Sequence, residues 1–250
     1  MFRHYSQASF KNNDKNGKMT PVTLRRMNFT EEFKMSAEST TVTPEHFRYL
    51  AERTTQEDDF LRDLKDAARA AEIPEIWISP EQAAFMQILL KLAGARSVVE
   101  VGTLAGYSAI VMARALPSGG MVRTIEMCGA HADFAEQWIA KSDVAGKVEV
   151  LRGQAHQVLP KLAADSADAA FIDADKVNYE LYLEQCLRIV RSGGLIMVDN
   201  AFAFGQLFDS EPADASVADV RKFNEVMARH AGLQSIIVPI GDGCWVGVKL

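Results

Sequence analysis

The feature that most constrains the fold is a regular alternation, after Gly94, of short β-branched runs with segments of helix length. Parallel strands need crossover connections of this length, usually helices that cover both faces of the sheet. The predicted strands span residues 97–101, 122–126, 148–152, 169–173, 195–199, 235–239 and 245–249. The sequence therefore predicts an α/β fold with a doubly wound, mostly parallel, seven-stranded sheet.

The final two predicted strands must pair differently from the others. Only residues 240–244 join them, too few for a parallel crossover, so we expect a C-terminal antiparallel hairpin. Helices are predicted over residues 108–115, 130–141, 157–163, 179–190 and 217–230. Thr43-Pro44 and Ser79-Pro80 are typical helix starts and predict two earlier helices, the first with a possible break near Thr54.

Residues 1–42 differ in composition from the rest of the chain. Residues 1–34 carry seven basic and three acidic side chains, although the chain of 250 residues has a formal charge of −6. No hydrophobic period runs through this segment, so we predict a basic, disordered extension before a single domain over residues 43–250. A vector-derived or wrongly assigned start is an alternative, with Met35 as the first residue of the compact part.

Composition excludes several classes of partner and site. The net negative charge argues against a nucleic acid partner, and no apolar run approaches the length needed to cross a bilayer. We therefore expect a soluble, cytoplasmic protein. Cys128, Cys186 and Cys244 form no C-x-x-C pair and are predicted to be small buried hydrophobic residues in a reducing compartment.

The turn after the first strand predicts a nucleoside-binding site. Gly102 and Gly106 allow a sharp turn into a helix whose first N–H groups are free, yet their spacing is not the G-x-G-x-x-G of dinucleotide folds. Glu100 would repel a pyrophosphate but suits a ligand with a positively charged amino group. Glu126, at the end of the second strand, is placed to accept hydrogen bonds from both hydroxyls of a ribose.

Acidic and amide side chains end two further strands. Asp173 follows the fourth strand, and Asp199 and Asn200 follow the fifth. If the strand order reverses between the first and fourth strands, these side chains converge beside the ligand crevice. An oxygen-only donor set suits Mg²⁺, Mn²⁺ or Ca²⁺ rather than zinc. The alternative is that these acids only cap and solvate their loops.

Lys176 lies three residues after Asp173 and is a candidate general base. A neighbouring divalent cation, together with a ligand that carries a positively charged sulfonium, would favour the neutral amine of Lys176. The neutral amine could then take the proton of a metal-bound hydroxyl. The alternative is a surface lysine paired with Asp175.

Five strings carry a resemblance to a known family. They are ISPEQ at 78–82, EVGTLAGYS at 100–108, FIDADKVNY at 171–179, RSGGLIMVDN at 191–200 and PIGDG at 239–243. With these strings, the chain from about residue 76 to residue 250 resembles the cation-dependent class I S-adenosylmethionine O-methyltransferases. That group contains the caffeoyl-CoA and catechol O-methyltransferases, and its fold is Rossmann-like.

The resemblance implies a role for each matching position. The residues implied to bind S-adenosylmethionine are Ile78 (through its backbone), Glu100, Gly102, Thr103, Ser108, Glu126, Ala155 and Asp173. Asp173, Asp199 and Asn200 would bind the cation, with Mg²⁺ expected first, and Lys176 occupies the position of the catalytic lysine. The acceptor would be a catechol-type small molecule, and the resemblance also implies a homodimer.

Two departures from the family pattern concern the acceptor. Ala203 stands where the caffeoyl-CoA group has tryptophan, and Ala83-Ala84 replace its Gly-Gln pair. These changes favour a catechol-bearing metabolite over a CoA thioester. Two other functions stay open from sequence: a non-catalytic S-adenosylmethionine-binding protein and an NAD-dependent oxidoreductase.

Overall fold

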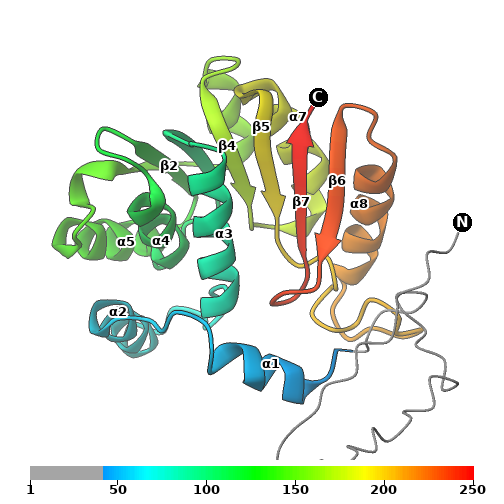
Figure 1. Cartoon of the computed structure of the whole chain (residues 1–250), viewed down its shortest axis with the longest axis horizontal. Coiled ribbons are helices and arrows are strands. Elements are labelled where there is room, and N and C mark those ends of the chain that lie inside the picture. The colour runs from blue at the N-terminus through cyan, green and yellow to red at the C-terminus, as the bar shows by residue number, and fades with distance from the viewer. Residues whose placement is uncertain (1–41) are drawn as a thin grey trace, which may run out of the picture. The chain divides into compact units, whose positions relative to one another are not determined.

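The predicted alternation of strands and helices is present in the computed structural model, which describes residues 42–250 (Figure 1). The strands are β1 (Ser97–Val101), β2 (Met121–Glu126), β3 (Val148–Arg152), β4 (Ala167–Ile172), β5 (Val190–Val198), β6 (Leu233–Val238) and β7 (Cys244–Lys249). They form one seven-stranded sheet in the order β3-β2-β1-β4-β5-β7-β6. The predicted doubly wound sheet is therefore confirmed.

The strand directions place the loops that matter for a site. β1 pairs in parallel with both β2 and β4, so the order reverses at β1 and the carboxyl ends of these strands open at one edge. β4 and β5 are also parallel, whereas β7 lies between β5 and β6 and is antiparallel to both. The hairpin turn between β6 and β7 consequently lies beside the end of β5.

Helices cover both faces of the sheet (Figure 1). The helices are α1 (Pro44–Ala51), α2 (Asp59–Ala70), α3 (Pro80–Leu92), α4 (Tyr107–Ala115), α5 (Gly129–Lys141), α6 (Ala155–Val158), α7 (Tyr179–Ile189) and α8 (Val217–Arg229). Buried side chains of α2 to α5 form one hydrophobic cluster with one face of the sheet. Those of α6, α7 and α8 form a second cluster with the other face.

Both predicted helix starts are present, at Pro44 and Pro80, and the second shows its capping contact. The Ser79 hydroxyl accepts a hydrogen bond from the Gln82 N–H, and Pro80 occupies the first turn of α3. The expected break near Thr54 is also present, because α1 ends at Ala51 and α2 starts at Asp59 after an Asp58 cap.

Two element bounds differ from prediction by more than two residues. The helix expected over 157–163 begins at Ala155 and continues past Val158 only as a 3-10 turn, where Pro160 lacks the N–H that an α-helix requires. β5 begins at Val190, five residues earlier than expected, across a register shift in its pairing with β4. Gly193 and Gly194 lie in that stretch, and glycine is uncommon in strand interiors.

Some predictions concern residues or properties that the structure only partly covers. The extension expected over residues 1–42 lies outside the described residues except for Val42. Cys186 and Cys244 are buried as expected, whereas Cys128 is half-buried, and all three are free thiols. Within residues 42–250, no helix has the length and apolar character needed to cross a membrane.

Candidate active site

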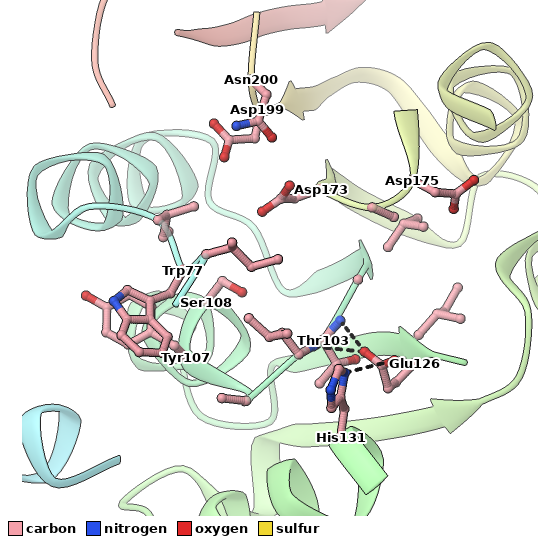
Figure 2. Close-up of a pocket in the computed structure, with 18 of the residues that line it drawn as sticks. Trp77, Thr103, Tyr107, Ser108, Glu126, His131, Asp173, Asp175, Asp199 and Asn200 are labelled. Atoms are coloured by element: carbon pink, nitrogen blue, oxygen red, sulfur yellow. Dashed lines mark hydrogen bonds and ion pairs between the residues drawn. The ribbon is translucent and has the colours of Figure 1, made fainter. Parts of the chain in front are cut away.

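A cavity of about 870 Å³ opens at the carboxyl edge of the sheet, where the order reverses (Figure 2). Ten of the eleven predicted site residues line it. They are Ile78, Gly102, Thr103, Ser108, Glu126, Ala155, Asp173, Lys176, Asp199 and Asn200. Residues more than a hundred positions apart in the chain are thus brought to one cavity, and Glu100 is the exception.

The turn between β1 and α4 forms one side of the cavity. Gly102 has φ +100°, and a Cβ there would lie 2.0 Å from the carbonyl oxygen of Asp173. Gly106, with φ +86°, precedes α4 and provides no side-chain cap. Only glycine therefore fits at position 102, and the N–H groups at the start of α4 have no side-chain cap.

The Glu126 carboxylate is held rigidly at the end of β2. Its Oε2 accepts hydrogen bonds from the backbone N–H groups of Thr103 (3.2 Å) and Leu104 (2.9 Å), and its Oε1 accepts one from Cys128 (2.8 Å). His131 Nδ1 lies 3.9 Å from Oε1 (Figure 2). Backbone donors fix this acceptor beside the turn, in a position suited to a ligand that carries hydroxyl groups.

Glu100 lies under the cavity rather than in its wall. Alternate strand residues face opposite sides of a sheet, and Glu100 shares its side with Val98, beneath the helices α2 to α5. Its side chain is 0 % exposed, and neither carboxyl oxygen has a hydrogen-bond partner. Burial raises the pKa of Glu100 to about 8. The hydroxyls of Ser108 and Thr124 offset part of the rise without reaching hydrogen-bonding geometry. The structure does not bring this residue to the cavity wall.

The three predicted cation ligands lie together at the other end of the cavity (Figure 2). Asp173 follows β4, while Asp199 and Asn200 follow β5, the neighbouring parallel strand. Lys176 joins two of them: its Nζ lies 3.1 Å from Asp173 Oδ1 and 2.6 Å from Asn200 Oδ1. Oxygen atoms from the ends of β4 and β5, on Asp173 and Asn200, therefore both contact the Lys176 ammonium group.

Lys176 is enclosed by its surroundings. Its side chain is 9 % exposed, and Nζ also donates to the hydroxyl of Tyr179 at 2.6 Å. Its ammonium lies 5.8 Å from the ring centre of Phe204, on the cavity wall. A lysine in this position has its terminal nitrogen fixed in the cavity rather than extended into solvent.

Asp199 has a buried partner that sequence analysis did not identify. Gln82, 1 % exposed at the start of α3, donates from Nε2 to Asp199 Oδ1 at 2.7 Å. Burial raises the pKa of Asp199 to about 7, and the neighbouring Asp173 charge adds to the rise, while the Gln82 hydrogen bond opposes it. The ISPEQ string contained Gln82, but helix-start chemistry alone explained its presence.

Asp242 is a second residue that sequence analysis missed. It lies in the β6–β7 turn, lines the cavity, and accepts a hydrogen bond from Asn200 Nδ2 at 3.1 Å. The PIGDG string placed it in a turn without indicating a partner. Its contact depends on β7 lying next to β5, which the pattern of short strands does not specify.

The residues present fit both a nucleoside-type ligand and a hard cation. Glu126 and the glycine turn provide a fixed acceptor and close backbone approach at one end. Asp173, Asp199 and Asn200 provide two carboxylates and an amide oxygen at the other. Among residues 42–250 there is no cluster of three or more His, Cys, Asp or Glu side chains arranged for a metal. A cation here would therefore depend on the Asn200 amide as well as on the two acids.

Comparisons with known proteins point to one family. The O-methyltransferase family model matches residues 51–250. A catechol O-methyltransferase of Niastella koreensis is 36% identical over 204 residues, which cover 80% of this chain and 90% of the relative. One from Mycobacterium tuberculosis is 35% identical over 208 residues, covering 83% and 94%. The crystal structure of an O-methyltransferase from Bacillus cereus in complex with SAH has a TM-score of 0.74 and 33% identity, covering 82% of this chain and 96% of that chain.

Proposed function

The chain belongs to the S-adenosylmethionine-dependent O-methyltransferase family, and we propose that it methylates one hydroxyl of a catechol-type small molecule with the help of a divalent cation. The observation that carries the proposal is the convergence of Asp173, Asn200 and Lys176 within hydrogen-bonding distance at the end of the donor cavity. The names of the relatives from Niastella koreensis and Mycobacterium tuberculosis support the choice of catechol.

The donor would occupy the end of the cavity around the glycine turn. Glu126, fixed by three backbone N–H groups, would accept hydrogen bonds from the ribose hydroxyls. The other proposed donor contacts are the cavity-lining residues Ile78, Gly102, Thr103, Ser108, Ala155 and Asp173. Glu100, beneath the same turn, would act on the donor only through the shape and charge of the pocket.

Asp173, Asp199 and Asn200 would hold the cation, and oxygen ligands favour Mg²⁺, with Mn²⁺ or Ca²⁺ as alternatives. When bound, the cation supplies Lewis-acid chemistry, which lowers the pKa of the acceptor hydroxyl and orients adjacent hydroxyls. Ala203, where the caffeoyl-CoA group has tryptophan, is fully buried in a cluster with Val217 and Val220 and does not line the cavity. Its effect on the acceptor wall would therefore act through the neighbouring Phe204, which does line the cavity.

Lys176 would be the general base. Its Nζ, in the neutral form that a neighbouring cation would favour, would accept the proton of the acceptor hydroxyl, and the resulting oxygen would attack the methyl carbon in line with the sulfur. The bond between sulfur and methyl breaks with its electron pair going to sulfur, leaving S-adenosylhomocysteine, the methyl ether and a protonated Lys176. Asp173 and Asn200, which already contact Nζ, keep it at the reacting oxygen.

Oligomeric state and location complete the proposal. We expect a homodimer in the cytoplasm. The exposed apolar side chains of Phe47, Tyr49 and Leu50 on α1 are compatible with a subunit contact. Light scattering during gel filtration measures the number of subunits directly.

The decisive test is methyl transfer from labelled S-adenosylmethionine to a panel of catechols and matched monophenols. We expect transfer to catechols with Mg²⁺, loss of transfer after exhaustive chelation with EDTA, and loss in Asp173→Ala. Activity that survives complete metal removal would refute cation dependence. Transfer to monophenols at the same rate would refute the catechol assignment.

A further inference from the structure

Asp242, in the turn between β6 and β7, contacts the segment that follows β5. It is half-buried and lines the cavity. Its Oδ2 accepts hydrogen bonds from Asn200 Nδ2 (3.1 Å) and from the backbone N–H of Phe204 (2.7 Å), and its Oδ1 accepts one from Gly205 (3.2 Å). Both carboxylate oxygens of Asp242 therefore accept hydrogen bonds from the segment that begins with Asn200.

The side-chain contact determines which end of the Asn200 amide faces the cavity. A carboxylate only accepts hydrogen bonds and an ammonium only donates them. Asp242 therefore fits the NH₂ group of Asn200 and not its oxygen, while Lys176 Nζ, at 2.6 Å, fits the oxygen and not the NH₂. The two partners on opposite ends select one of the two amide orientations, with Oδ1 toward Asp173 and Lys176.

The backbone of this segment is strained, which explains why it needs to be held. Asn200, Ala203 and Phe204 have φ of +63°, +53° and +59°, in the left-handed region that non-glycine residues seldom adopt. The hairpin also fixes it through main-chain bonds: Ala201 N–H donates to Gly243 O and Phe202 N–H to Asp242 O, both at 2.8 Å. Strained backbone persists where its surroundings over-determine it, and here they hold Asn200 in place.

We propose that Asp242 is a positioning residue that turns the Asn200 amide oxygen into the cation site. The inference rests on the proposed function, because it assumes that Asp173, Asp199 and Asn200 bind the cation. Without the Asp242 carboxylate, the Asn200 NH₂ group loses its acceptor and only Lys176 still opposes rotation of the amide. A rotated amide presents its NH₂ group, which a cation repels. Asp242 touches neither donor nor reacting atoms in this role and acts only through Asn200.

Asp242→Leu tests the inference, because it keeps the approximate size of the side chain but removes the oxygen that accepts from the Asn200 NH₂ group. Mn²⁺ affinity is measured by electron paramagnetic resonance on the protein saturated with S-adenosylhomocysteine. Loss of a residue that orients a metal ligand weakens metal binding by about 10- to 100-fold, and we expect a loss in this range. S-adenosylhomocysteine affinity, measured by calorimetry, should stay within about twofold, since the donor end has no contact with Asp242.

The same substitution in an Asn200→Asp background separates orientation from charge. A carboxylate at position 200 presents an oxygen in either rotamer, so Asp242→Leu should then weaken Mn²⁺ binding by less than about threefold. In the same background Asp242→Asn can donate to the new carboxylate, which restores a hydrogen bond with donor and acceptor exchanged and keeps the test usable if Asp242→Leu alone fails to fold. Asp214→Asn is the matched charge control, because Asp214 lines the same cavity but accepts its hydrogen bonds from Ser216.

The outcomes are distinct. Unchanged Mn²⁺ affinity in Asp242→Leu, an equal loss in both backgrounds, or an equal loss in Asp214→Asn would each overturn the positioning role while leaving the proposed function intact. Failure of the unsubstituted protein to bind Mn²⁺ would refute the cation site itself, and the positioning role with it. A loss confined to the Asn200 background supports the proposal.

Discussion

Replacement of Glu100 by glutamine is expected to change how the stability of this protein depends on pH. Glu100 is fully buried, its oxygens lack hydrogen-bond partners, and its pKa is raised from 4.5 to about 8. Between these two values the folded protein binds a proton at Glu100 that the unfolded chain has released. Stability must therefore fall as pH rises through this window, because the folded state binds more protons than the unfolded state.

The size of the effect follows from the pKa difference. One extra bound proton changes the free energy of unfolding by about 1.4 kcal/mol per pH unit. From about pH 5 to about pH 8 the unsubstituted protein should lose roughly 4 kcal/mol that Glu100→Gln does not lose. This is a large share of the stability of a typical domain, about 5–15 kcal/mol. The stabilisation from the bound proton should have its full size below the unfolded pKa. The difference in unfolding free energy between the two proteins should stop changing above about pH 8.

The assay is urea denaturation of both proteins without donor at pH values across this window, with the difference in unfolding free energy plotted against pH. Because the other titrating groups are common to both proteins, the difference isolates Glu100. Glu184→Gln, which removes an exposed carboxyl on α7, is the matched control and should change stability by less than about 0.5 kcal/mol. A difference between protein and Glu100→Gln that stays constant from about pH 5 to about pH 8 would refute the reasoning.

Three further substitutions test separate parts of the site. Lys176→Met should leave S-adenosylhomocysteine affinity intact in calorimetry and lower kcat by about 10²- to 10⁴-fold, the range for a general base, so an unchanged rate contradicts that role. Gly102→Ala should abolish donor binding, since its Cβ would lie 2.0 Å from the Asp173 carbonyl oxygen; Gly146→Ala, where a Cβ meets nothing within 4 Å, should bind normally. Gln82→Met should lower the free energy of unfolding by about 1–3 kcal/mol, because the buried carboxylate loses its donor, and denaturation that shows no loss argues against that contact.

The sheet and the strand-end residues could be predicted because their signals are local. β-branched runs mark strands wherever they occur, and a glycine turn, an acid or an amide directly after a strand must lie at its carboxyl edge. These signals predict that Gly102, Glu126, Asp173 and Asn200 share one edge of the sheet, and all four line the cavity. The side of β1 on which Glu100 lies was not predicted. A strand that is buried on both faces shows no alternation of apolar and polar residues from which its sides could be assigned.

The residues that contact the predicted cation-binding side chains could not be found from the sequence. Gln82 reaches Asp199 across 117 positions, and Asp242 reaches Asn200 only because β7 inserts between β5 and β6. A hairpin placed on the outer side of the sheet in the opposite strand order would satisfy the same pattern of short strands. Tertiary arrangement rather than residue type decides these contacts.

The way the two ends of the cavity are built has a consequence for the order in which they form during folding. The donors to Glu126 lie at most 23 residues away in the chain, whereas Asp199 and Asn200 depend on partners 117 and 42 residues away. Contacts between residues distant in sequence form more slowly, because closing long loops costs chain entropy before any contact compensates. A refolding molecule should therefore form the contacts around Glu126 before those around Asp199 and Asn200, so that the proposed cation site is completed after the Glu126 end of the cavity.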